Sequence, residues 1–126
     1  MANLFLIGRI IFGGFFVYQA YNHFKNHGGL TQYAQSKKLP MASVMVYISG
    51  ALMLLGGVSI VANIYPLLGM WLLVLFLVPT TFMMHAFWKE TDGQARMSEM
   101  SAFFKNFALI GALCMLIALS TVILGA

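Results

Sequence analysis

Charged residues are scarce in this sequence. Asp, Glu, Lys and Arg make up 8% of its 126 residues, whereas a soluble domain carries about 25%. None of them occurs between Met41 and Trp88, and 61% of all residues are hydrophobic. A chain with so few polar groups could not cover its surface in water. The composition therefore excludes an ordinary soluble protein and predicts contact with a lipid bilayer.

Cysteine is nearly absent. Cys114 is the only one and lies in an apolar segment. An intramolecular disulfide, a CxxC redox pair and a cysteine-rich metal site are therefore all excluded. Among the histidines, only His23 and His27 have the i, i+4 spacing of helical ligands, and this pair straddles the start of a predicted loop. No metal site is predicted.

Acidic residues are also few, three against seven Lys and Arg, and the net charge is +4. The basic residues form no cluster with interleaved aromatic residues, so nucleic acid is not a predicted partner. In a membrane protein the same residues determine orientation and attract anionic lipid.

Four long apolar segments occupy most of the chain. Each is close to the roughly 20 residues that a helix needs to cross a bilayer. None alternates polar and apolar residues as a barrel strand would, so helices are predicted. Nothing basic precedes the first segment, so we expect it to remain as a membrane helix rather than a cleaved signal. The predicted fold is all-α, an integral membrane antiparallel four-helix bundle in a single transmembrane domain, 1–126. Its helices are expected over about residues 4–24, 41–64, 66–88 and 101–125.

The connections between the segments differ in character. Asn63–Pro66 is a tight turn, and its proline suits the first turn of the next helix. In the first connection, 22–40, a short interfacial helix is predicted from Thr31 after a Gly28–Gly29 break, with a disordered polar loop as the alternative. The third connection, 89–100, is expected to be a solvated loop. It holds all three acids of the chain, Glu90, Asp92 and Glu99.

Basic residues gather in the first and third connections and are missing from the tight turn and both termini. They are Lys25, Lys37, Lys38, Lys89 and Arg96, with Lys105 close by. The positive-inside rule predicts that these two connections are cytoplasmic and that both termini lie outside.

Arg9 is the most costly residue of the first segment. An arginine at the bilayer centre costs about 2.5–3.5 kcal/mol, and less nearer the boundary. Counted from Leu4, Arg9 would lie roughly 7–8 Å below the outer boundary. Its helical face also carries Gly13, Phe16, Ala20 and His23, so this face is expected to turn inward. Arg9 is interpreted either as a buried cation for an anionic or carbonyl-bearing ligand, or as a residue that reaches the outer headgroups. Its candidate protein partners are Ser59, Ser120, Thr121 and the backbone carbonyl of Leu75.

A second group of polar residues is expected at the cytoplasmic end. His85 is interpreted as a boundary residue bonded to Asn106 or to a backbone carbonyl, or alternatively as a ligand-binding or proton-handling group. Lys105 is expected to reach the headgroups or to pair with an acid of the third connection, and Asn106 to form an interhelical hydrogen bond. The candidate ligand-binding residues are Arg9, His85, Trp88, Lys105 and Asn106; no catalytic residue is assigned.

Five stretches, in order along nearly the whole chain, carry a family resemblance. They are GRIIFGGFFVYQAYNHF, LTQYAQSKKLP, GALMLLGG, TFMMHAFW and FFKNFALIGALC. Together they resemble the DoxX-like family of small four-helix membrane proteins. The resemblance implies a compact bundle, in the bacterial inner membrane. Some members are similar to the membrane subunit of a thiosulfate:quinone oxidoreductase, others are associated with oxidative-stress complexes, and distant relatives are membrane chaperones. Members often carry Glu where this chain has Met53, and that Glu is expected to lie within reach of Arg9.

Three functions are compatible with these features. The first is an accessory membrane component of a redox system, with an interhelical site for a quinone and with electrons supplied by a partner protein. It has no covalently bound cofactor, and whether the chain is itself an enzyme stays open. The second is a scaffold or chaperone that binds other membrane proteins, or further copies of itself, through small-residue faces. The third, transport, is less favoured, because four helices form a small pathway unless the protein oligomerises. The small-residue faces are centred on Gly13, Gly50, Gly56 and Gly111.

Overall fold

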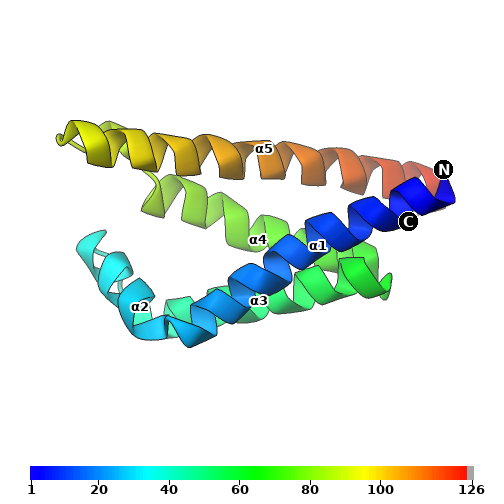
Figure 1. The fold of residues 1–126 in the computed structure, drawn as a ribbon, viewed down its shortest axis with the longest axis horizontal. Coiled ribbons are helices and arrows are strands. Elements are labelled where there is room, and N and C mark those ends of the chain that lie inside the picture. The colour runs from blue at the N-terminus through cyan, green and yellow to red at the C-terminus, as the bar shows by residue number, and fades with distance from the viewer. Residues whose placement is uncertain (125–126) are drawn as a thin grey trace. The chain divides into compact units, whose positions relative to one another are not determined.

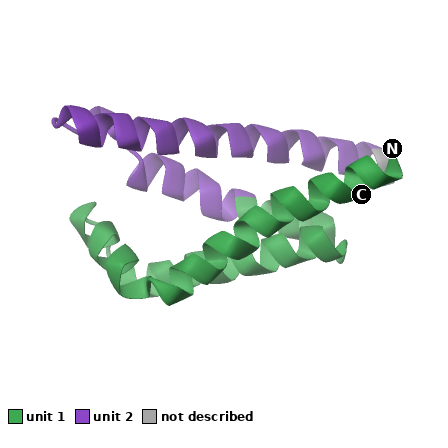
Figure 2. Cartoon of the chain, viewed as in Figure 1, with its two compact units in different colours: residues 1–73 green, residues 74–126 purple. Residues whose placement is uncertain are grey.

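The computed structural model describes residues 1–124, and these residues contain helices and no strand (Figure 1). The elements are α1 (Ala2–Lys25), α2 (His27–Ser36), α3 (Ala42–Ala62), α4 (Pro66–Met84), the 3-10 helix η1 (Phe87–Lys89) and α5 (Gly93–Leu124). The all-α class and the short helix in the first connection are confirmed. The chain divides into two compact units, Met1–Leu73 and Val74–Ala126, with the boundary inside α4 (Figure 2).

Within residues 1–124, four helical segments are long and apolar enough to cross a membrane. They are Ala2–Lys25, Ala42–Ala62, Pro66–Lys89 and Gly93–Val122. At most a third of the most apolar stretch of each is buried within the chain. Large apolar side chains are exposed along all four segments, and surface of this kind is stable only against hydrocarbon. The chain is therefore an integral membrane protein.

Glycines bring α1 and α3 into close contact in the first unit. A Cβ atom added to Gly13 would lie 2.7 Å from the carbonyl oxygen of Gly57, and one added to Gly57 would lie 2.7 Å from that of Gly13. Gly13, Phe16 and Ala20 are the buried residues of α1, so the predicted inward face is confirmed. Small residues allow two membrane helices to approach until their backbones touch.

The turn between α3 and α4 forms as the sequence predicts. Asn63 ends α3 in the left-handed conformation, with φ of 58°, which asparagine adopts more readily than most residues. Pro66 is the first residue of α4, where its missing N–H has no cost. Gly56 then packs against Leu73 and the carbonyl of Gly69. In the first unit, α3 and the start of α4 therefore form an antiparallel pair.

The second helix begins earlier than expected. It starts at His27 and includes Gly28 and Gly29, so the predicted glycine break and the Thr31 cap are wrong. The His27 ring stacks on Tyr47 with 3.8 Å between ring centroids, and its Nε2 lies 2.9 Å from the carbonyl oxygen of Ser43. These contacts with α3 hold the first turn in place and outweigh the low helix propensity of glycine.

The third connection is shorter than expected, because residues 93–100 are helical. Asp92 precedes α5, and its Oδ2 accepts a hydrogen bond of 2.9 Å from the N–H of Ala95, as an N-terminal cap does. At the other side, α4 ends at Met84 rather than near Trp88, and η1 follows. The acid Glu99 therefore lies on a helix instead of a solvated loop.

Candidate functional site

Arg9 binds the end of α3. Its Nε donates to the carbonyl oxygen of Ile60 at 3.2 Å, and its Nη2 donates to that of Val61 at 3.1 Å. Carbonyls in the last turn of a helix have no partner within the helix and form its negative end. The guanidinium thus supplies donors and positive charge where α3 needs both. Its Cζ also lies 5.7 Å from the centre of the Phe5 ring, within cation–π distance.

These bonds differ from the partners predicted for Arg9, which were side chains or the carbonyl of Leu75. Thr121, one of them, donates to the carbonyl of Ile117 on its own helix. The 21 residues of α3 rise about 30 Å, the thickness of the hydrocarbon core. Arg9 is therefore expected close to a membrane boundary, and its side chain is partly buried.

The His85 side chain contacts Glu99 in the second unit. Its Nδ1 lies 3.3 Å from Oε2 of Glu99, and the two side chains are only 18% and 12% exposed. The sequence suggested Asn106 or a backbone carbonyl as the partner of His85, and it missed Glu99. Glu99 shares a face of α5 with Phe103 and Asn106, at offsets of four and seven residues. That spacing could have revealed it, had α5 been expected to begin at Gly93.

Two further buried polar residues belong to the same unit. Thr81 is fully buried one turn before His85, and its hydroxyl has no hydrogen-bond partner within the described part of the chain. Asn106 is 5% exposed. The rings of Phe82 and Phe103 meet with 5.5 Å between their centroids, so α4 and α5 are in contact here. The side chains of Thr81, His85, Glu99 and Asn106 are called the polar site below.

Three aromatic rings pack against one another in the second unit. Phe87, Trp88 and Phe103 meet edge to face at centroid distances of 5.3–5.6 Å. The guanidinium of Arg96 lies 5.5 Å from the centre of the Phe87 ring. The aromatic group reaches the surface, since Trp88 is 48% exposed.

The sequence was compared with known proteins. The DoxX family model matches residues 4–86, which is more than half of the chain. This chain belongs to the DoxX family. No curated protein and no solved structure matches it. The DoxX match includes Arg9 and His85 and ends before Trp88, Lys105 and Asn106.

The position at which DoxX proteins often carry Glu does not adjoin Arg9 in this chain. Met53 occupies it and is 1% exposed. The carbonyls that Arg9 contacts lie seven and eight residues further along α3, roughly 11–12 Å away along the helix axis. The expectation that a Glu at residue 53 would pair with Arg9 is therefore wrong for this arrangement. The end of α3 takes the place of a counter-ion.

The candidate residues separate into two groups. Arg9 belongs to the first unit and has the surroundings given above. His85, Trp88 and Asn106 belong to the second unit, where His85 contacts Glu99 and Trp88 contacts Phe103, both on α5. Lys105 is exposed on α5, about 100° around the helix from Asn106, as expected from its position. In residues 1–124, no group of three His, Cys, Asp or Glu side chains could hold a metal ion.

Proposed function

We propose that this DoxX protein is an accessory membrane component of a redox system, and that its polar site binds the headgroup of a quinone. The observation that carries the proposal is the Thr81 hydroxyl, which is fully buried and lacks a partner. Nearly all buried polar groups in proteins are hydrogen-bonded, so an exception needs an explanation. A ligand oxygen that accepts from this hydroxyl would supply one.

Quinone chemistry fits the residues of the polar site. A quinone has a flat apolar ring and two carbonyl oxygens, which accept hydrogen bonds. Thr81 and Asn106 carry donors for such oxygens, and aromatic edges pack well against a flat ring. Reduction to the quinol consumes two electrons and two protons. His85 and Glu99 are groups that can pass protons, and the electrons are assigned to the redox centre of a partner protein.

The proposed orientation places the polar site at the cytoplasmic face. The first and third connections carry the basic residues and are assigned to the cytoplasm. Both termini are assigned to the outer side of the bacterial inner membrane. The polar site lies where α4 ends and α5 begins, directly beside the third connection. Protons taken up on quinone reduction would then come from the cytoplasm through the His85–Glu99 pair.

The structure offers no separate observation for the scaffold alternative. Of the small residues expected to bind other helices, Gly13, Gly50 and Gly56 are in contact with neighbours in their own chain. A Cβ atom added to any of them would lie within 3.0 Å of another atom. Of these four glycines, only Gly111 has nothing within 4 Å of an added Cβ atom. The small-residue faces are therefore mainly used to assemble this protein.

Quenching of tryptophan fluorescence tests the proposal. In a Trp71→Phe background the remaining Trp88 adjoins the polar site, and a short-chain quinone can be titrated into protein held in nanodiscs. Loss of one hydrogen bond in Thr81→Val is expected to weaken quinone binding about tenfold, since a neutral hydrogen bond contributes roughly 0.5–1.5 kcal/mol. Thr121→Val is the matched control, because its hydroxyl already bonds within α5.

The effect of Thr81→Val on quinone binding can be separated from any effect on protein stability. Replacing a buried hydroxyl that has no partner with a methyl group of the same shape is expected to leave stability unchanged or raise it by about 1 kcal/mol. Thr81→Val should therefore unfold at the same temperature as the parent, or higher, while it binds quinone less tightly. Equal quinone affinity in Thr81→Val and the parent, or no saturable quenching of the parent, would refute the proposal.

A further inference from the structure

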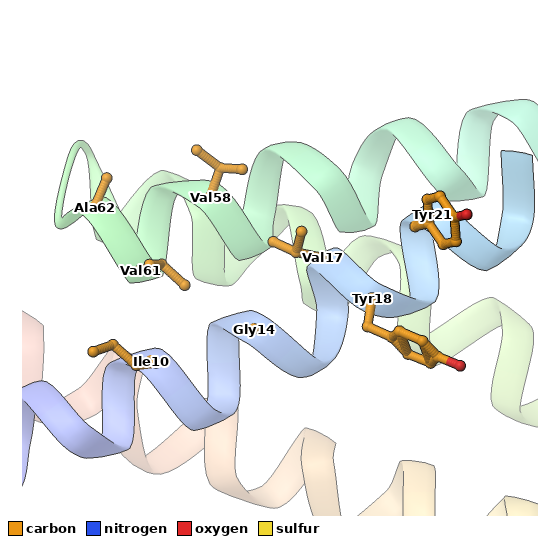
Figure 3. Close-up of a pocket in the computed structure, with 8 residues that line it drawn as sticks. All are labelled: Ile10, Gly14, Val17, Tyr18, Tyr21, Val58, Val61 and Ala62. Carbon is orange, nitrogen blue, oxygen red and sulfur yellow. The ribbon is translucent and has the colours of Figure 1, made fainter.

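A groove runs along the outside of the first unit, between α1 and α3 (Figure 3). Its volume is about 460 Å³, within the range of roughly 300–1,000 Å³ found for ligand sites. It is lined by Ile10, Gly14, Val17, Tyr18, Tyr21, Val58, Val61 and Ala62. None of these side chains is charged. The groove does not overlap the polar site, whose residues belong to the second unit.

Two adjacent glycines explain why the groove exists. Gly13 lets α1 and α3 touch, whereas a Cβ atom added to Gly14 would meet nothing within 4 Å. Gly14 therefore leaves open space beside the closest contact of the two helices. Its neighbours in the groove are branched aliphatic side chains at one end and two tyrosines at the other (Figure 3).

The length of the groove is close to the thickness of one leaflet of a bilayer. From Ile10 to Tyr21 the helix rises roughly 16 Å, about half of the ~30 Å hydrocarbon core. Arg9 immediately precedes Ile10 and binds the final carbonyls of α3, which spans the core, so this end lies at the membrane boundary. The tyrosine end then lies deeper in the membrane, about one helical turn before Lys25 at the other end of α1.

We infer that the groove holds an acyl chain of an anionic phospholipid, with the lipid phosphate bound by Arg9. Charge complementarity selects this occupant. A guanidinium has five N–H donors, and two of them are directed at the carbonyls of Ile60 and Val61. Donors remain for a phosphate oxygen, and charge-assisted bonds between Arg and phosphate are among the strongest hydrogen bonds in proteins. The apolar lining suits the chain that such a phosphate carries.

Native mass spectrometry of the detergent-solubilised full chain tests this site. Phosphatidylglycerol and phosphatidylcholine with identical acyl chains are titrated separately. The parent is expected to bind the first phosphatidylglycerol about tenfold more tightly than the first phosphatidylcholine, a difference of roughly 1.4 kcal/mol. Arg9→Gln should lose this preference, whereas Arg9→Lys should retain part of it. Inorganic phosphate at the same concentrations should not displace the lipid, because it has no acyl chain.

A groove-filling variant keeps the test independent of the role of Arg9 in folding. Gly14→Leu places a side chain in the groove and leaves Arg9 in place, so phosphatidylglycerol binding should fall about tenfold. Gly8→Leu is the matched control, because Gly8 also has open space around it and lies outside the groove. Thr81→Val, which tests the quinone site, should bind phosphatidylglycerol like the parent.

Four results would overturn the inference. They are equal affinities for the two lipids in the parent, unchanged binding in Gly14→Leu, displacement of the lipid by a quinone, and a dimer that only Gly14→Leu abolishes. The third result would assign the groove to quinone, and the fourth to a second copy of the chain.

Discussion

Arg9 shows how a membrane protein accommodates a charge without an acidic partner. Its helical face was predictable, because residues three and four apart share a side of a helix, and Gly13, Phe16 and Ala20 are buried accordingly. Its partners were not predictable, because backbone carbonyls at the end of another helix leave no mark in the sequence. The same applies to Thr81: a threonine in an apolar run gives no indication that its hydroxyl lacks a partner.

Loss of the Arg9 charge should weaken the first unit. We expect Arg9→Met to lower the free energy of unfolding by about 1.5–3 kcal/mol, the usual contribution of a hydrogen bond to a charged group. The measurement is thermal unfolding in one detergent, followed by circular dichroism. Lys89→Met is the control, since it removes the same charge from an exposed residue. If Arg9→Met lowers the free energy of unfolding no more than Lys89→Met does, the bonds of Arg9 to the end of α3 do not stabilise the protein.

At the scale of elements, the sequence predicts the helices well and their ends poorly. Hydropathy identifies four spans, because only long apolar helices are stable in lipid. The start of α5 was missed, because residues 93–100 are polar and helical, and Asp92 caps them locally. Because the start of α5 was predicted too late, Glu99 was assigned to a loop and was not recognised as the partner of His85. The start of α2 was missed because its stability comes from contacts of His27 with α3.

The contact between α1 and α3 should be intolerant of a single methyl group. In Gly13→Ala the new Cβ would lie 2.6 Å from Val61 Cγ2 and 2.7 Å from the Gly57 oxygen, so the helices must separate. We expect a loss of stability of about 1–3 kcal/mol, as for overpacked cores. Gly111→Ala, in open surroundings, should instead gain roughly 0.5–1 kcal/mol from helix propensity. Thermal unfolding of both variants in one detergent tests this pair, and an unharmed Gly13→Ala would contradict the observed contact.

For the whole molecule, four membrane-crossing segments and the distribution of charge define an orientation that can be tested directly. An even number of crossings returns the chain to the side on which it started. The turn after α3 has no basic residue, whereas the connections on either side of the α3–α4 pair have several. Each Lys or Arg close to a membrane helix favours the cytoplasmic side. Asn3 and Ile64 should therefore lie outside, and Ser36 and Asp92 in the cytoplasm.

Cysteine labelling checks this orientation, because the chain has only one native thiol to remove. In a Cys114→Ala background, single cysteines at Asn3, Ile64, Ser36 and Asp92 are exposed to a membrane-impermeant maleimide in intact spheroplasts. The first two should react at once, and the last two only after lysis, since an intact bilayer keeps the charged reagent from the cytoplasm. The reverse pattern would place the polar site on the outer face. Protons for a bound quinone would then come from outside, and the redox partner proposed for this protein would have to act there as well.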